Sequence, residues 1–318
     1  MLKKEKMLLK LEWQYYWWKS AFRYGVCKIN NQFSIFRKYA GRNVLAEEEC
    51  NRWIENRICK NIPTAICRFG AVELNMLRKI EYCKIFAKKP KNYEEVAEQI
   101  KICAGFFKND EESLNEFHRL MVALLPETDL LGEWNLPMEE YFINKYMLDT
   151  KLTRLGYLDS WGRDQCWTRA LKGKRVVVIH PFADTIVKQY ANREKIWKNG
   201  DILPEFELRV VKAVQTIAGE KDERFVTWFD ALEYMYNETV REEFDVALIG
   251  CGAYGMPLAL KLKRNGNIAI HIGGGLQLLF GIKGKRWENC SFYNEFWVFP
   301  NEEETPQYAN RVENGCYW

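Results

Sequence analysis

Four short segments that are rich in polar residues or in glycine each follow an apolar run. They are RFGAVE (68–73), HPFADT (180–185), GCGAYG (250–255) and HIGGGLQLLFGIKGKRW (271–287). Continuous apolar runs are typical of strands that are buried on both faces of a parallel sheet. The carboxyl ends of parallel strands share one edge of the sheet, where open α/β sheets bind their ligands. We therefore expect these four segments to build one site.

The segment GCGAYG has the GxGxxG spacing between a predicted strand and a predicted helix. Gly250, Gly252, Tyr254 and Gly255 are candidates for binding phosphate, because glycine lets the backbone approach and a helix N-terminus offers N–H donors. An NAD-binding fold would place an acidic residue at the end of the next strand, where this chain has His271. Two alternatives stay open: an NAD(P)-dependent oxidoreductase, and a turn that needs glycine for packing alone.

A second glycine turn lies at the end of the following predicted strand. Gly273 and Gly274 are followed by Gln277, Lys285 and Arg286. Backbone amides of such turns can hold phosphate oxygens, and Lys or Arg side chains counter the phosphate charge. Two glycine turns beside a basic cluster therefore predict a diphosphate site. The alternative is a solvated basic loop.

Residues able to move a proton occur at two other strand ends. Glu73, preceded by Arg68 and Gly70, stands in the first turn of a predicted helix, where it could accept a proton or bind a divalent metal. His180 and His271 both end predicted strands, and His180 is the second candidate base. The alternatives are a glutamate that only favours the helix dipole and histidines that only hydrogen-bond within the fold.

Five further residues are weaker candidates near the same edge. Three tryptophans could stack on a sugar or a base, whereas two aspartates could act in the site or cap helices. These residues are Trp134, Trp161, Trp167, Asp184 and Asp230. We expect at least one of the tryptophans to pack in the core.

The elements that must position these residues alternate along the chain. This order predicts an α/β fold with a mostly parallel, Rossmann-like sheet flanked by helices. Strands, some running into turns, are expected at 63–70, 128–134, 153–161, 174–182, 206–213, 244–255 and 267–275. Helices are expected at 46–61, 71–80, 137–148, 183–197, 225–242 and 256–266, with two more within 91–125.

The composition is that of a folded globular protein, with 47% hydrophobic and 28% charged residues among 318. A net charge of +4 is too small to predict nucleic-acid binding by bulk electrostatics. The ten cysteines lack a CxxC pair, which argues against zinc and favours free thiols in the cytoplasm. Neither an apolar run of 18 residues nor a secretory signal pattern occurs.

Residues 1–45 are expected to form a basic, aromatic, helical extension ahead of a single domain at 46–318. The first 60 residues hold 13 Lys and Arg against 6 Glu, and lysines alternate with Trp and Tyr in residues 1–25. Such a stretch can lie in a membrane interface, here at the inner face of the membrane. The alternative is a helix that packs on the domain through its aromatic side.

The segment RFGAVEL (68–74) resembles the RFGDGEL-type segment of GT-D-type glycosyltransferases. Residues 176–287 and 293–318 are similar to uncharacterised proteins of bacterial capsule and O-antigen clusters, so that the resemblance covers residues 60–318. In that family a DxE motif holds a metal beside the diphosphate of a nucleotide sugar. This chain has Ala71 in place of the aspartate, and only Glu73 carries over.

The resemblance implies a glycosyltransferase that moves a sugar from a nucleoside diphosphate sugar to a glycan or lipid-linked acceptor in surface polysaccharide synthesis. Glu73 or His180 would be the base. Mn²⁺ or Mg²⁺ would be held by Glu73 and the substrate phosphates, or Lys285 and Arg286 would take its place. A non-catalytic assembly protein of such clusters, in which the glycine turns only pack, stays an alternative.

Overall fold

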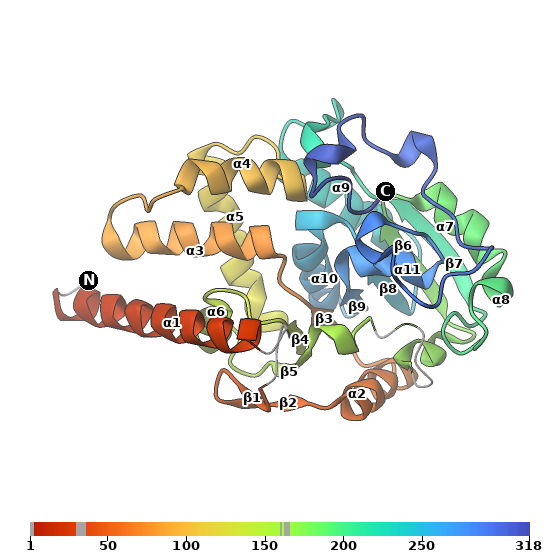
Figure 1. Ribbon diagram of the computed structural model, residues 1–318, viewed down its shortest axis with the longest axis horizontal. Helices are drawn as coiled ribbons and strands as arrows, with labels where there is room; N and C mark the ends of the chain where they lie inside the picture. Colours follow the sequence, from red (N-terminus) through yellow and green to blue (C-terminus); the bar gives the residue numbers. More distant parts are fainter. Residues whose placement is uncertain (1–2, 30–35, 160, 162–165) are drawn as a thin grey trace.

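The computed structural model of the chain describes residues 3–29, 36–159, 161 and 166–318. Within these residues, nine strands form one sheet in the order β1-β2-β5-β4-β3-β9-β8-β6-β7 (Figure 1). β1 is antiparallel to β2, and the other neighbouring strands of the sheet are parallel. The predicted α/β fold, with a mostly parallel sheet and a helical N-terminal segment, is confirmed.

The strands are short, and the four central ones, β4, β3, β9 and β8, are buried along their whole length. The strands are β1 (Lys38–Tyr39), β2 (Arg42–Leu45), β3 (Thr64–Cys67), β4 (Leu130–Glu133), β5 (Lys151–Arg154), β6 (Arg175–His180), β7 (Glu207–Lys212), β8 (Val246–Ile249) and β9 (Ile268–His271).

Helices cover both faces of this sheet. They are α1 (Lys3–Ile29), α2 (Glu47–Cys59), α3 (Ala71–Phe86), α4 (Tyr93–Ala104), α5 (Glu111–Leu124), α6 (Glu139–Tyr146), α7 (Ala183–Tyr190), α8 (Arg193–Ile196), α9 (Trp228–Val240), α10 (Gly255–Arg264) and α11 (Leu276–Leu279). Their starts follow local chemistry: α9, for example, begins after Thr227, which forms a capping box with Asp230.

Alternate residues of the central strands contribute to two separate cores. In β8, Val246 and Leu248 belong to one core, whereas Ala247 and Ile249 belong to the other. Residues of α3, α4, α5, α9 and α10 complete one core, and residues of α2, α7 and the C-terminal part complete the other. Because both faces are covered, these strands are continuous apolar runs, which is the pattern that predicted them.

Two predicted elements differ from the structure. The strand expected at 153–161 lies earlier, because β5 ends at Arg154 and a short 3-10 helix at Leu155–Tyr157 turns the chain away. This turn places Leu158 in the core.

The single helix expected at 183–197 is interrupted between α7 and α8. The side-chain amide of Asn192 donates to the carbonyl of Lys188 at 3.3 Å, in place of the backbone N–H that a continuing helix would supply.

Residues 38–45, which we assigned to the N-terminal extension, form the edge of the sheet. Val44 of β2 pairs with Leu152 of β5, and the Arg42 guanidinium donates to the carbonyl of Met147 at 2.6 Å and to that of Thr150 at 2.9 Å. The division of the chain at residue 45 stays a prediction, but these two strands are part of the sheet.

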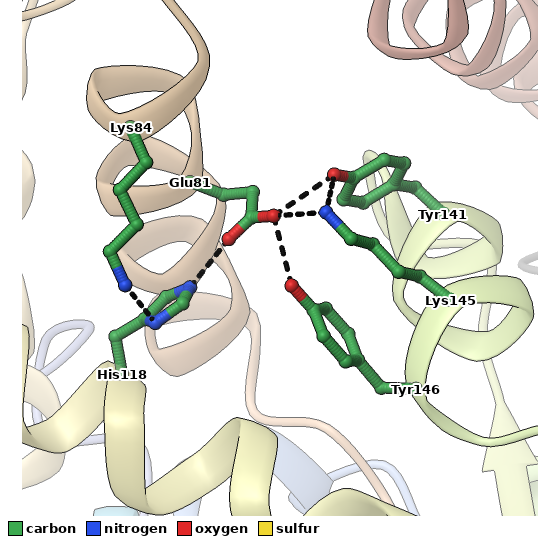
Figure 2. Close-up of polar contacts among 6 residues, drawn as sticks. All are labelled: Glu81, Lys84, His118, Tyr141, Lys145 and Tyr146. Carbon is green, nitrogen blue, oxygen red and sulfur yellow. Dashed lines mark hydrogen bonds and ion pairs between the residues drawn. The ribbon is translucent and has the colours of Figure 1, made fainter. Parts of the chain in front are cut away.

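A buried polar cluster joins α3, α5 and α6 (Figure 2). Its members are Glu81, Lys84, His118, Tyr141, Lys145 and Tyr146. Lys84 donates to Nδ1 of His118 at 2.7 Å, so the Nε2 proton of His118 is directed at Glu81, also at 2.7 Å. Burial alone would raise the pKa of Glu81, but the hydrogen bonds from His118 and Lys145 hold this pKa well below its usual range. The cluster fixes the three helices to one another.

A second buried carboxyl group, that of Glu139 in α6, has a raised pKa, whereas the pKa of Glu81 is lowered. Burial raises its pKa to about 8, and the nearby negative charge of Glu133 adds to this shift. Its Oε2 accepts the hydroxyl of Tyr39 at 3.0 Å and the backbone N–H of Leu136 at 3.2 Å. A protonated Glu139 therefore links α6 to β1 at neutral pH.

This raised pKa predicts a pH-dependent stability. Folded Glu139 holds its proton more tightly than the unfolded chain does, so its contribution to the free energy of unfolding falls as the pH rises from 4.5 to about 8. Glu139→Gln keeps the acceptor oxygen but cannot ionise, and we expect it to lose less stability than the parent between about pH 5 and about pH 8. Urea unfolding at each pH measures the free energy of unfolding of the parent and of Glu139→Gln. Glu48→Gln, on the exposed side of α2, is the control. Equal pH dependence in parent and Glu139→Gln would contradict this account.

Candidate active site

The four segments identified in the sequence meet at one edge of the sheet. Strands β3, β9, β8 and β6 are successive parallel neighbours, so their carboxyl ends share that edge. A cleft of about 1000 Å³, partly open to solvent, lies there. The chain leaves β3 toward β4 and leaves β6 toward β7, in opposite directions across the sheet. The cleft therefore occupies the topological switch region where α/β sheets bind ligands.

Twelve of the fourteen predicted site residues line this cleft. They are Arg68, Gly70, Glu73, His180, Gly250, Gly252, Tyr254, His271, Gly273, Gly274, Gln277 and Arg286. The other two lie outside its lining: Gly255 packs against the ring of His271, and exposed Lys285 reaches the backbone carbonyl of Asn314 at 3.4 Å. The expectation that Lys285 faces the site is corrected, because its side chain bonds to the C-terminal segment.

Glu73 lies at the N-terminus of α3 with its carboxylate folded back over Gly70. A Cβ at Gly70 would stand 1.8 Å from Oε2 of Glu73, so this side-chain position requires glycine there. Burial raises the pKa of Glu73, although its own backbone N–H and the Arg68 guanidinium act in the opposite direction. A carboxyl group with a raised pKa, facing a cleft, is suited to exchange a proton with a ligand hydroxyl.

Arg68 follows β3 and stacks its guanidinium over Trp134, 4.8 Å from the ring centroid. Trp134 is itself held by a hydrogen bond from its indole N–H to the carbonyl of Phe69 at 3.0 Å. Gly273 makes room, because its φ is +76° and a Cβ there would lie 2.7 Å from Nη1 of Arg68. Nε of Arg68 is buried without a hydrogen-bond partner among the described residues. An unsatisfied buried guanidinium donor points to an anionic ligand.

His180 is buried at the end of β6 and presents a hydrogen-bond donor. Its Nδ1 accepts the backbone N–H of Phe182 at 3.0 Å, so the ring proton of the neutral form is on Nε2. Burial lowers the pKa of His180 to about 3. Such a ring can donate to an oxygen of a ligand but has no free lone pair to take a proton. The geometry therefore favours Glu73 over His180 as the base.

His271 is buried at the end of β9 and also lines the cleft. Its Nδ1 is buried without a partner within the described residues. Burial, with a smaller contribution from the Arg68 charge, lowers the pKa of His271 to about 3. A Cβ at Gly255 would lie 2.2 Å from Cε1 of this ring, so Gly255 is needed to seat the histidine. The neutral ring therefore has one nitrogen, Nδ1, that makes no hydrogen bond within the described residues.

The two glycine turns pack closely on other segments as well as lining the cleft. Gly252 has a φ of +58°, and a Cβ there would lie 2.8 Å from the carbonyl oxygen of Ala104. A Cβ at Gly250 would lie 2.7 Å from the carbonyl oxygen of Gly273. Packing thus explains the glycines without excluding ligand binding by their backbones.

The C-terminal tail forms a wall of the cleft that sequence patterns did not reveal. Glu313, Tyr317 and Trp318 line the cleft beside Arg286. Arg286 forms an ion pair with Glu313 and lies over the ring of Tyr317, 4.8 Å from its centroid. The charge of Arg286 is therefore partly compensated by Glu313. In the sequence, the adjacent aromatic residues Tyr317 and Trp318 are the feature that could have indicated this wall.

Two of the lining residues mainly support the framework. Gln277 donates to the carbonyls of Lys283 at 2.8 Å and Tyr317 at 3.0 Å, which holds the tail in place. Tyr254 stacks on Trp228 with ring centroids 4.8 Å apart, and it is almost fully buried. Both residues therefore hold neighbouring segments of the cleft wall in position.

Of the weaker candidates, Trp134 alone lines the cleft. Trp161 and Trp167 are buried, and each donates its indole N–H to a backbone carbonyl. Asp184 is exposed on α7, and Asp230 caps α9. The latter four residues therefore have structural or surface roles.

Carboxylate, imidazole and thiol groups are the side chains that could hold a metal ion in this cleft. Within the described parts of the chain, no three His, Cys, Asp or Glu side chains are arranged to hold a metal ion together. The acidic residues that line the cleft are Glu73 and Glu313, and Glu313 is paired with Arg286. One unpaired carboxylate fits Mg²⁺ or Mn²⁺ poorly without further ligands from substrate phosphates.

Comparison with known proteins leaves the family open. No family model matches the chain, and no curated protein matches it. Among solved structures, the chain is similar to one described as a selenomethionine-substituted domain of unknown function 1792. The similarity has a TM-score of 0.43 and 12% sequence identity, and it covers 86% of this chain and 95% of that chain. This likeness is too distant to carry a functional argument.

Proposed function

We propose that this protein is a glycosyltransferase that transfers a sugar from a nucleoside diphosphate sugar to a glycan or lipid-linked acceptor in surface polysaccharide synthesis. The observation that carries the proposal is the presence, in one cleft, of a guanidinium whose buried Nε has no partner among the described residues and of a partly buried carboxyl group with a raised pKa. The guanidinium of Arg68 suits a diphosphate leaving group, and the carboxylate of Glu73 suits an acceptor hydroxyl. The polysaccharide context rests on the sequence resemblance alone.

The diphosphate would lie between Arg68 and the glycine turns at 250–255 and 273–275. Arg68 supplies charge-assisted hydrogen bonds, and His180 adds a neutral donor through Nε2. Because these donors are held in place before the substrate arrives, they stabilise the charge that develops on the leaving diphosphate at little reorganisation cost. Arg286 contributes less, since Glu313 already compensates its charge.

The transfer step then needs one base. The acceptor hydroxyl oxygen forms a bond to the anomeric carbon, the bond from that carbon to the diphosphate oxygen breaks, and the hydroxyl proton passes to Glu73. The electron pair of the broken bond leaves with the diphosphate. Trp134, which lines the cleft and stacks on Arg68, is the aromatic residue that we expect to contact the sugar.

An NAD(P)-dependent oxidoreductase is less well supported. The position at which a dinucleotide fold uses a carboxylate to bind the ribose hydroxyls is occupied by His271 at the end of β9. The ring of His271 is packed against Gly255. A ribose bound in the usual way would therefore meet an imidazole rather than an acidic acceptor.

A thermal-shift panel separates the candidates. We expect UDP, GDP or another nucleoside diphosphate to raise the melting temperature, because a ligand at 100 times its Kd stabilises the folded state by about 2.7 kcal/mol. NAD and NADP are measured in parallel, and inorganic sulfate at equal ionic strength controls for a general anion effect. A shift with NAD or NADP alone would favour the oxidoreductase. The absence of any nucleotide shift would favour a non-catalytic assembly protein.

A further inference from the structure

One side of helix α1 carries a stripe of exposed apolar side chains. Met7, Leu11, Trp18, Phe22 and Ile29 follow one another in steps of four and seven residues, which return to the same side of an α-helix. Their exposed fractions run from 54% for Leu11 to 85% for Ile29. Single exposed apolar residues are ordinary, but a stripe that runs the length of a helix indicates a binding surface.

The opposite side of α1 is already occupied by the protein. Trp13 is 5% exposed and packs its ring against Tyr141 of α6 at 5.1 Å. The backbone N–H of Met138 donates to Ser20 at 3.0 Å, and Asn144 donates to the hydroxyl of Tyr16 at 2.8 Å. The helix is therefore apolar on two sides, one buried against α3 and α6 and one turned outward. Figure 1 shows α1 at the periphery of the molecule, below α3.

The charge on α1 identifies the kind of surface that this stripe fits. The helix holds seven basic and two acidic residues, and of the basic ones Lys19 and Arg23 pair with Glu140 of α6 on the packed side. Lys10 and Lys28 are 18 residues apart, a whole number of turns, so both stand on one flank of the stripe. Lys4 lies among the apolar residues near the N-terminal end. An apolar stripe flanked by lysines and containing Trp and Phe matches the interface of a bilayer with anionic headgroups.

We propose that α1 seats the protein on the surface of a membrane rich in anionic lipid. The stripe enters the boundary between headgroups and acyl chains while the lysines contact lipid phosphates. In the proposed contact, α1 lies in the plane of the membrane surface. No described helix is long and apolar enough to cross a bilayer. The proposal concerns a lipid surface and does not depend on the reaction proposed for the cleft.

The attachment of α1 fixes the cleft relative to such a surface. The guanidinium of Arg78 in α3 lies over Trp17 of α1, 5.5 Å from the ring centroid. The first residues of α3, Ala71 to Glu73, line the cleft. A small pocket lined by Ala71, Asn75 and Arg78 lies between these two features. A membrane bound to α1 is thus connected through one helix to the residues at the mouth of the cleft.

Flotation with lipid vesicles tests the proposal. We expect the parent protein to float with vesicles of phosphatidylcholine and phosphatidylglycerol and to bind vesicles of phosphatidylcholine alone about tenfold more weakly. The variant Leu11→Glu/Trp18→Glu/Phe22→Glu should bind the mixed vesicles at least about tenfold more weakly than the parent protein does. The matched control places glutamate at three exposed apolar positions away from α1, as Leu148→Glu/Val187→Glu/Val226→Glu, and should float like the parent.

Each of these outcomes decides the proposal. Circular dichroism and the melting temperature establish that both triple variants keep their fold, since the substituted side chains are exposed. Failure of the parent to float with anionic vesicles would overturn the proposal, as would equal loss in the control variant. If light scattering shows that the parent is a dimer and that the α1 variant is a monomer, with no flotation by either, the stripe instead binds a second copy. Nucleotide binding in solution is unaffected by any of these results, so the two proposals can fail separately.

Discussion

Replacing Glu73 by glutamine is expected to lower the rate of sugar transfer by about 10²- to 10⁴-fold, the usual contribution of a positioned general base. The substitution keeps the size and the oxygen that folds over Gly70, but it removes the group that takes the proton. Affinity for the nucleoside diphosphate should stay within a few-fold of the parent value, because the proposed mechanism assigns Glu73 to the acceptor hydroxyl and not to the diphosphate. Steady-state transfer assays and calorimetry measure the two quantities separately.

The pH profile gives this prediction a second test. Burial raises the pKa of Glu73, and the base must be ionised to act, so the transfer rate of the parent should fall as the pH falls through a value above the usual 4.5. The residual rate of Glu73→Gln should lack this acidic limb. Since a neutral side chain suits this partly buried position, the variant should melt no lower than the parent near about pH 8. Full transfer activity in Glu73→Gln, with the acidic limb intact, would remove Glu73 from the mechanism.

Replacing Arg68 by glutamine is expected to weaken binding of a nucleoside diphosphate by about ten- to a hundredfold, since hydrogen bonds to charged groups contribute about 1.5–3 kcal/mol. The loss should be much smaller for the free nucleoside, which carries no phosphate for Arg68 to contact. Calorimetric titration with UDP or GDP and with uridine or guanosine distinguishes the two contributions. The nucleotide that gives the larger thermal shift is the one to use.

Arg78 offers a matched control for this experiment. Like Arg68 it is a partly buried arginine whose guanidinium lies over a tryptophan ring, but it stands outside the cleft lining. Arg78→Gln should therefore bind the nucleotide as the parent does. If Arg68→Gln binds the diphosphate as tightly as the parent, or if both variants weaken binding equally, the anion site has been placed wrongly.

The parts of the fold that were predictable are those whose pattern is local. β6, β8 and β9 are buried on both faces, and such strands are continuous apolar runs in the sequence. Because parallel neighbours share an edge, the prediction that four turns converge followed from the strands alone. By contrast, β1 and β2 have only two and four residues and no apolar run, so their place in the sheet depends on distant partners.

The features of the site that could not be predicted depend on contacts between distant segments. The C-terminal wall depends on Gln277 and Arg286, which hold Tyr317 from about thirty to forty residues away. The donor role of His180 depends on the backbone N–H of Phe182, and therefore on the exact course of one turn. Lys285 turns away from the cleft although Arg286, its neighbour, lines it. Residue type identified the candidates, and tertiary structure decided which way they point.

The central claim is that this cleft holds a diphosphate at the ends of β3, β8 and β9. A crystal structure of the protein with the nucleoside diphosphate that gives the largest thermal shift tests it most directly. The account predicts diphosphate oxygens within hydrogen-bond distance of Arg68 and of the backbone at Gly252 or Gly273. It also predicts an open space beside Glu73 for the sugar and its acceptor. A nucleotide bound elsewhere, or bound in the cleft with its phosphates turned away from Arg68, would contradict it.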